Sequence, residues 1–222
     1  MLVLFDIDDT LLDHTAACRS AAMRLHHQYG GSSSLERFLA NWMDALDRHY
    51  DRYLAGKISF HEQRRARVRD VIDRALSDEA ADGVFADYLA AYEQAWTLFP
   101  DVLPCLDSLA SFRLGVISNG HEPQQRNKLA KTGILDRFEH VVISSDAGCA
   151  KPDSAIFLRA CTQAKESPSN AVYVGDRYDV DAQGARAAGL HGIWLDRMHQ
   201  ASSEHTPPVI RSLTDLFALL PR

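Results

Sequence analysis

The sequence Met1–Thr10 reads MLVLFDIDDT, and this stretch decides the fold. Its apolar run Leu2–Phe5 ends at polar residues, a pattern typical of a short buried strand. Asp6 and Asp8 follow at the carboxyl end of that strand, where open α/β sheets bind their ligands. Because alternate strand residues point the same way, both carboxylates can face one spot. Two such anions repel each other by roughly 4 kcal/mol at a distance of about 4 Å and an effective dielectric of about 20, so we expect a divalent cation between them.

The composition is that of an ordinary globular protein. Of the 222 residues, 46% are hydrophobic and 24% are charged, and the net charge of −6 argues against nucleic acid as a partner. Four scattered cysteines without a C-x-x-C pair indicate reduced thiols and no zinc site. No apolar run has the length of a membrane span, and the amino terminus lacks the basic region of a signal peptide. We therefore expect a cytoplasmic protein, monomeric or homodimeric, with no membrane partner.

Proline placement divides the chain into two parts. All eight prolines lie at or after Pro100, and residues 11–99 contain only four glycines. Because glycine often ends helices and proline is poorly tolerated inside them, this stretch predicts roughly four helices. Leu35–Leu54 carries a wide apolar stripe at helical spacing, and Ser77 is a typical start of another helix. We predict an all-helical domain over residues 14–97, inserted after the first strand.

After Pro100, short apolar runs alternate with segments that suit helices. The predicted strands are Leu114–Ile117, Val141–Ile143, Ala171–Val174 and Ile193–Leu195, and the predicted helices between them are Glu122–Lys131, Pro152–Lys165 and Val180–Ala188. Strands that alternate with helices predict a parallel sheet with right-handed crossovers. With the first strand, this gives a five-stranded α/β core made of residues 1–13 and 98–222. Residues 198–208 are predicted to be a loop, and Ile210–Leu220 a closing helix.

The pair Asp6 and Asp8 suits attack by a carboxylate on phosphorus. Asp6 would form an aspartyl-phosphate, while Asp8 would protonate the leaving oxygen and then deprotonate the attacking water. Taken alone, a D-x-D pattern is equally consistent with a solvated turn that carries a capping aspartate.

Two further motifs follow predicted strands and carry groups that can bind phosphate. The hydroxyl of Ser118 and the amide of Asn119 could hold a phosphate oxygen, although a turn with a helix cap has the same sequence. Lys151 could neutralise a phosphoryl oxygen, although a lone lysine in a loop is usually a surface charge.

The fourth motif is the acidic stretch Gly175–Asp181, with the sequence GDRYDVD. Its Asp176 ends a predicted strand; with the carboxylate of Asp6 and the backbone carbonyl of Asp8, it would supply the oxygen ligands that Mg²⁺ favours. Asp181 would either lie behind these ligands or cap the next helix. Thr10 would also lie behind the ligands. An Asp-rich turn is the alternative for this motif alone. All four motifs nevertheless fall at the carboxyl ends of separate predicted strands, an arrangement that coincidence does not explain.

The chain resembles the haloacid dehalogenase superfamily, in the branch with a helical cap between the first and second motifs. The matching residues are FDIDDTLLD at 5–13, ISNG at 117–120, AKPD at 150–153 and VGDRYDVDAQGARAAG at 174–189. The resemblance implies a Rossmann-like core of five parallel strands, dependence on Mg²⁺ and an aspartyl-phosphate intermediate. It also implies a substrate that enters between core and cap.

Asp8 separates the branches of this superfamily. Its dehalogenases keep the nucleophile but lack the second aspartate and need no metal, so the resemblance implies a phosphatase. The expected substrate is a small phosphate ester, either a nucleoside monophosphate or a sugar phosphate. Three alternatives stay open: a 2-haloacid dehalogenase, a phosphomutase, and a non-catalytic binding protein of the same fold.

Overall fold

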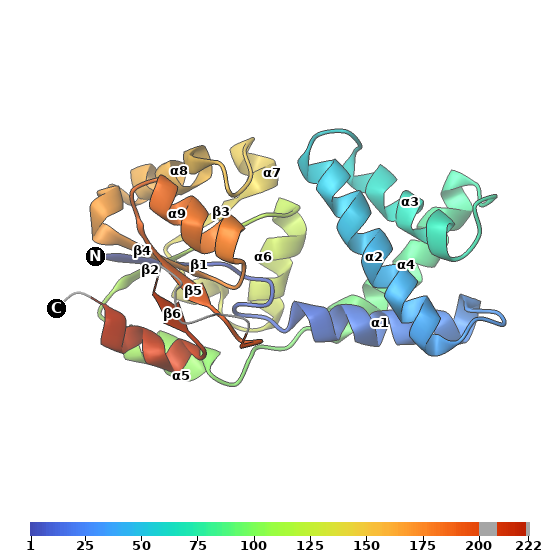
Figure 1. Cartoon of the computed structure of the whole chain (residues 1–222), viewed down its shortest axis with the longest axis horizontal. Coiled ribbons are helices and arrows are strands. Elements are labelled where there is room, and N and C mark those ends of the chain that lie inside the picture. The colour runs from blue at the N-terminus through green and yellow to red at the C-terminus, as the bar shows by residue number, and fades with distance from the viewer. Residues whose placement is uncertain (200–207, 221–222) are drawn as a thin grey trace. The chain divides into compact units, whose positions relative to one another are not determined.

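The computed structural model describes residues 1–199 and 208–220. The chain forms two compact units, one made of Met1–Asp13 with Thr97–Arg222 and the other of His14–Trp96. Figure 1 shows the first unit as a sheet flanked by helices and the second as helices alone. None of the described helices is long and apolar enough to cross a membrane.

The first unit is built on a six-stranded sheet in which all neighbouring strands are parallel. Its strands are β1 (Leu2–Phe5), β2 (Arg113–Ser118), β3 (His140–Ile143), β4 (Ala171–Gly175), β5 (His191–Leu195) and β6 (Val209–Ile210). Across the sheet they lie in the order β3-β2-β1-β4-β5-β6. Strand β1 therefore lies inside the sheet, between β2 and β4. Its four residues are completely buried, which explains why the sequence there is a continuous apolar run.

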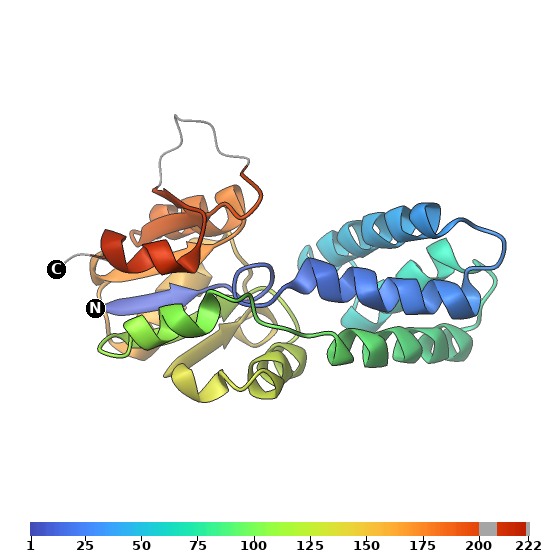
Figure 2. The same cartoon turned by 90° about the horizontal axis from the view of Figure 1, so that it is seen from below.

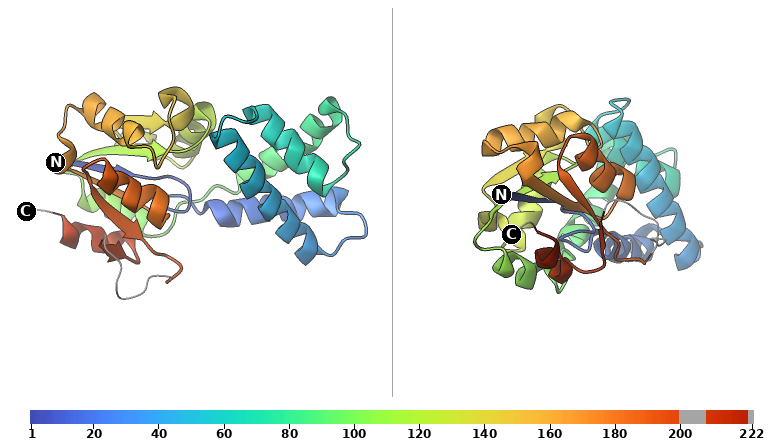
Figure 3. Two further views of the ribbon diagram at one scale, coloured as in Figure 1. Left: turned by 45° about the horizontal axis from the view of Figure 1, so that its top comes forward. Right: turned by 60° about the vertical axis from the view of Figure 1, so that its left-hand side comes forward.

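Helices cover both faces of this sheet. They are α5 (Val102–Ser108), α6 (Glu122–Lys131), α7 (Ser144–Ala147), α8 (Ser154–Ala164) and α9 (Gly184–Ala187), with short 3-10 segments η1 (Leu135–Arg137), η2 (Pro168–Asn170) and η4 (Leu213–Leu219) and the π-helical segment η3 (Tyr178–Gln183). In Figure 1, α8 and α9 lie on one side of the sheet and α5 on the other. Figure 3 shows η4 next to α5. The predicted helix Glu122–Lys131 is confirmed by α6.

The predicted α/β class with a parallel sheet is confirmed, but two details of the C-terminal part are wrong. The sheet has a sixth strand because Val209 and Ile210 pair with Trp194 and Leu195 of β5. The closing helix is correspondingly shorter, and η4 is a 3-10 helix that begins only at Leu213. Most of the predicted loop over residues 198–208 lies outside the described residues.

The second unit consists of the helices α1 (His14–Tyr29), α2 (Leu35–Leu54), α3 (Phe60–Val71) and α4 (Asp78–Gln94). Figure 2 shows α1 and α4 side by side, and α2 packs against α3. Side-chain oxygens of Ser34, Ser59 and Ser77 accept backbone amides at the starts of α2, α3 and α4, so the predicted helix start at Ser77 is confirmed. Trp42 and Tyr88 are buried in the core of this unit with ring centroids 4.7 Å apart.

Candidate active site

Three of the predicted motifs meet at one edge of the sheet because neighbouring parallel strands end there together. Asp6 directly follows β1, Ser118 ends β2, and Asp176 directly follows β4. The backbone amide of Asp6 donates to the carbonyl of Val174 at 2.9 Å, which keeps the end of β1 against the end of β4. This edge is the place where open α/β folds bind their ligands.

A tight turn follows Asp6. The amides of Leu11 and Leu12 both donate to the carbonyl of Ile7 at 2.9 Å, and Asp9 adopts a left-handed conformation with φ of 57°. Aspartate tolerates this conformation better than most residues because its short side chain can hydrogen-bond locally. The turn ends the strand abruptly and keeps the acidic residues at the sheet edge.

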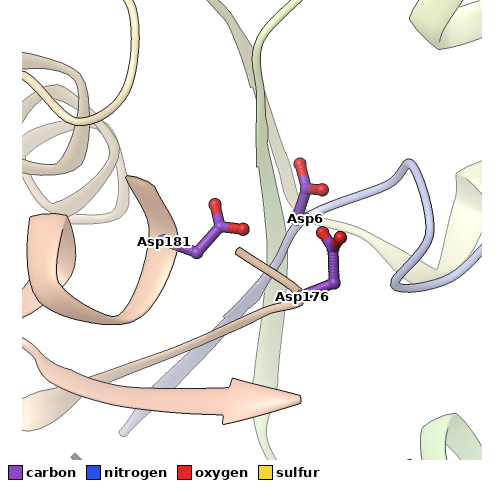
Figure 4. Close-up of side chains that lie close together, drawn as sticks. All are labelled: Asp6, Asp176 and Asp181. Atoms are coloured by element: carbon purple, nitrogen blue, oxygen red, sulfur yellow. The ribbon is translucent and has the colours of Figure 1, made fainter. Parts of the chain in front are cut away.

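The carboxylates of Asp6, Asp176 and Asp181 form one cluster. They can each offer an oxygen that lies within 4.8 Å of the other two, and Figure 4 shows the three side chains next to one another. Asp6 and Asp176 come from the ends of β1 and β4, whereas Asp181 comes from η3. Asp6 and Asp181 are buried, and Asp176 is partly buried.

Lys151 places a buried ammonium group against this cluster. Its Nζ lies 2.7 Å from Oδ1 of Asp6, 2.6 Å from Oδ1 of Asp181 and 2.7 Å from the hydroxyl of Tyr173. The side chain of Lys151 is only 3% exposed. When all groups are ionised, the three clustered carboxylates outnumber this one ammonium group by two charges.

The pKa values reflect this excess of negative charge. Burial raises the pKa of Asp6 to about 6; Lys151 opposes this rise, whereas Asp181 and Asp8 add to it. Burial also raises the pKa of Asp176 well above its usual range, and Asp181 and Asp6 raise it further. Burial alone would lower the pKa of Lys151, but the nearby carboxylates of Asp181 and Asp6 outweigh burial and raise this pKa. The ionised cluster therefore carries more negative than positive charge, and its hard oxygen ligands could hold a divalent cation.

Asp181 is held in place by three neighbours. Its Oδ1 accepts the Lys151 ammonium and lies 3.2 Å from the Tyr173 hydroxyl, while its Oδ2 accepts the backbone amide of Arg177 at 3.0 Å. A Cβ at Gly175 would lie 2.4 Å from the Asp181 Cγ. Glycine therefore precedes Asp176 because a side chain there would occupy the space that Asp181 fills.

Asn119 ties the lysine loop to the end of β2. Its side-chain Oδ1 accepts the backbone amide of Lys151 at 2.8 Å, and its Nδ2 donates to the carbonyl of the same residue at 2.9 Å. Ser118 is buried, and its Oγ accepts Nε2 of Gln125 at 2.8 Å. The side chain of Asn119 thus positions Lys151, a contact separate from the predicted role of the Asn119 backbone amide.

Asp8 lies outside the three-carboxylate cluster. Both of its oxygens contact Nζ of Lys128, at 2.6 and 2.8 Å, and Oδ2 also accepts Nε2 of Gln125 at 3.0 Å. The sequence predicts that Asp6 and Asp8 face one spot, but the structure gives each carboxylate its own lysine. Asp8 is still close enough to contribute to the raised pKa of Asp6.

Thr10 is completely buried beside the cluster. Its hydroxyl lies 3.5 Å from Oδ1 of Asp176, a long contact, and its carbonyl accepts a guanidinium nitrogen of Arg197 at 2.8 Å. These contacts place Thr10 next to the acidic cluster and fix its backbone.

Some side chains that contact this site belong to none of the predicted site residues, among them Tyr173, Gln125 and Lys128. Tyr173 is the one hydroxyl-bearing residue in the buried strand β4, and that isolated polar atom is the signal that could have identified it. Gln125 and Lys128 lie three residues apart on the predicted helix after Ser118, so they share one helix face. Their partner Asp8 is far away in the sequence, and no local pattern connects it with them.

Comparisons with known proteins place the chain among hydrolases. The family model of the haloacid dehalogenase-like hydrolases matches residues 1–189. The glyceraldehyde 3-phosphate phosphatase of Methanopyrus kandleri is 31% identical, over 88% of this chain and 83% of that protein. Among solved structures, the 2-haloacid dehalogenase of Pseudomonas syringae pv. Tomato DC3000 is 31% identical with a TM-score of 0.72, covering 98% of this chain and 96% of that one. The magnesium-bound HAD hydrolase YfnB of Bacillus subtilis shares the fold, with a TM-score of 0.81 at 22% identity over 100% and 98% of the two chains.

Proposed function

This chain belongs to the haloacid dehalogenase-like hydrolases and is a phosphoric monoester hydrolase, and we propose that it works with Mg²⁺ through an aspartyl-phosphate intermediate. Its substrate is a small phosphorylated metabolite, for which we propose a nucleoside monophosphate or a sugar phosphate. The observation that carries this proposal is the buried Lys151 ammonium between Asp6 and Asp181, with Asp176 alongside. The proposed nucleophile Asp6, the ammonium group of Lys151 that would bind phosphate, and the carboxylates that would bind the metal therefore lie together.

In the proposed first step, an oxygen of Asp6 attacks phosphorus and the ester P–O bond breaks. Asp8 gives its proton to the departing alcohol oxygen. In the second step, Asp8 takes a proton from water, the water oxygen attacks phosphorus, and the bond between phosphorus and Asp6 breaks to release phosphate. Lys151, the hydroxyl of Ser118 and the amide of Asn119 bind the phosphoryl oxygens during both steps.

Asp6 and Asp176 would hold Mg²⁺ through their carboxylates and Asp8 through its backbone carbonyl. When bound, Mg²⁺ would supply positive charge that offsets the repulsion between the carboxylates and a substrate phosphate. Both oxygens of Asp181 already accept hydrogen bonds from Lys151 and the Arg177 amide. These contacts favour a place for Asp181 behind the direct ligands, where it orients Lys151.

The main alternative is cleavage of a carbon–halogen bond, as in the dehalogenase named above. A halide leaves as a stable anion and needs no proton, so a dehalogenase has no use for an acid at the position of Asp8. An alkoxide leaving group does need that proton. The carboxylate of Asp8, two residues after the nucleophile, therefore favours phosphate esters.

With Mg²⁺, the purified chain is expected to release phosphate from p-nitrophenyl phosphate and from several members of a panel of nucleoside monophosphates and sugar phosphates. Chelation of the metal should lower this rate by at least about 100-fold because the carboxylate repulsion is then uncompensated. The same protein should release no chloride from 2-chloropropionate. Phosphate release from none of the esters would contradict the proposed function, and metal-independent chloride release would favour the dehalogenase. Transfer of phosphate to a second sugar hydroxyl in place of water would favour a phosphomutase.

Mg²⁺ binding is expected to weaken below pH 6. In the metal-free protein the pKa of Asp6 is raised to about 6, so its carboxyl is increasingly protonated as the pH falls through 6, and the raised pKa of Asp176 favours protonation of that carboxyl too. Mg²⁺ must displace those protons, so its Kd should rise at least about 10-fold between pH 7 and pH 5. Titration calorimetry in two buffers with different ionisation enthalpies measures both the Kd and the protons released. A Kd that does not change with pH, with no proton release at pH 5.5, would contradict the pKa assignment.

A further inference from the structure

The carboxylate of Asp8 binds the ammonium group of Lys128, a residue that belongs to none of the four motifs. Nζ of Lys128 lies 2.6 Å from one Asp8 oxygen and 2.8 Å from the other. The Lys128 side chain is 3% exposed, whereas that of Asp8 is 26% exposed. Charge-assisted bonds to both oxygens fix where the carboxylate lies and how it is turned.

Gln125 supplies a second contact from the same helix. Its Nε2 donates to Oδ2 of Asp8 at 3.0 Å and to Oγ of Ser118 at 2.8 Å. Gln125 is 2% exposed, and a Cβ at Gly120 would lie 2.8 Å from its Cγ, so the backbone passes close behind it. Because Gln125 and Lys128 are three residues apart on α6, one rigid helix face supports the Asp8 carboxylate and the Ser118 hydroxyl together.

Asp8 needs such support because of its neighbours. A carboxylate two residues from Asp6 is repelled by Asp6 when both are ionised, and a cation in the cluster would attract it as a further ligand. A carboxylate that coordinates a cation is no longer placed to exchange a proton with the leaving group. The contacts of Asp8 with Lys128 and Gln125 compete with coordination of a cation by its carboxylate. The Asp8 carboxylate accordingly lies outside the cluster of Asp6, Asp176 and Asp181.

We propose that Lys128 and Gln125 are positioning residues, which hold the Asp8 carboxylate away from the cation site and in the orientation for proton transfer to the leaving oxygen. This inference rests on the proposed function, since it assigns Asp8 the role of acid and base. It predicts that removing either residue harms substrates that need a proton on the leaving group more than substrates that do not.

The test compares two leaving groups in the Lys128→Met variant, which keeps the side-chain length and loses the ammonium group. p-Nitrophenolate departs without a proton, whereas the alcohol of an alkyl phosphate needs one. We expect the first-turnover rate with the alkyl phosphate that the wild type hydrolyses fastest to fall about 30- to 100-fold, with KM within about threefold of wild type. The p-nitrophenolate burst should slow by less than about fivefold. Gln125→Leu should show the same selectivity with a smaller loss.

Lys131→Met on the exposed part of α6 is the matched control and should match the wild type with both substrates. Thermal melts followed by circular dichroism check that each variant is folded. Equal losses with both substrates would show a merely structural role, and no loss with either would show no role; both results overturn the inference. In an Asp8→Asn background, Lys128→Met should cause no further selective loss with the alkyl phosphate. The proposed function fails separately, if the wild type hydrolyses neither substrate with Mg²⁺.

Discussion

Replacement of Asp6 by asparagine is expected to lower kcat by at least about 10⁴-fold with every phosphate ester that the wild type hydrolyses. An amide has no anionic oxygen with which to attack phosphorus, so the first covalent step is lost. The side chain keeps its size, and its carbonyl oxygen can still accept the Lys151 ammonium, which in the wild type lies 2.7 Å from Oδ1. Phosphate release at saturating substrate measures the effect.

The loss should come without unfolding. The Asp6→Asn substitution removes one of three carboxylates that repel each other, and burial raises the pKa of Asp6 to about 6, so the ionised Asp6 destabilises the wild type at pH 7.5. Without metal at this pH, the thermal stability of the variant should therefore equal or exceed that of the wild type. Asp136→Asn makes the same chemical change at an exposed position and should leave activity unchanged. An Asp6→Asn variant that retains a tenth or more of the wild-type kcat would contradict the assignment of Asp6 as nucleophile.

Replacement of Lys151 by methionine is expected to damage both stability and turnover. Without metal at pH 7.5, the free energy of unfolding should fall by about 3–5 kcal/mol, because the substitution removes the ammonium group that partners the buried Asp6 and Asp181. With Mg²⁺, kcat should fall by about 10²–10³-fold, because a group that stabilises charge on the transferring phosphoryl is gone. Urea unfolding and steady-state kinetics measure the two effects.

The pH dependence of the stability loss follows from the raised pKa of Asp6. Below about pH 6 the carboxyl of Asp6 is increasingly protonated, so less negative charge is left without a partner. The destabilisation by Lys151→Met should therefore be smaller at pH 5 than at pH 7.5. Lys131→Met serves again as the exposed control. A destabilisation that is equal at both pH values would show that the loss comes from packing and not from charge.

Much of the core was predictable because its signals are local. Strand β1 is an apolar run that stops at an acidic pair, and α6 follows a turn motif and has the helical boundaries that the sequence indicates. Parallel strands end at a common edge, so the ends of β1 and β4 could be expected to bring Asp6 and Asp176 together without any knowledge of distances.

The features that local patterns could not predict depend on distant partners. Val209 and Ile210 form a strand by pairing with the edge of β5, and a run of two apolar residues is too short to predict a strand by itself. The partners of Asp8 come from α6, and strand alternation alone says nothing of them. Periodicity predicts the direction in which a side chain leaves the backbone. The charged residues that it contacts are set by the tertiary structure, which periodicity does not predict.

The most direct measurement is whether Asp6 itself carries the phosphoryl group during turnover. Enzyme that is quenched with acid during hydrolysis and reduced with borohydride should contain homoserine in place of an aspartyl-phosphate. Fragmentation of the peptide that spans residues 1–13 should place homoserine at position 6, only in samples that contained substrate and Mg²⁺. Homoserine at position 8 or elsewhere, or an unmodified peptide throughout steady turnover by a method that detects a control acyl phosphate, would contradict the proposed mechanism.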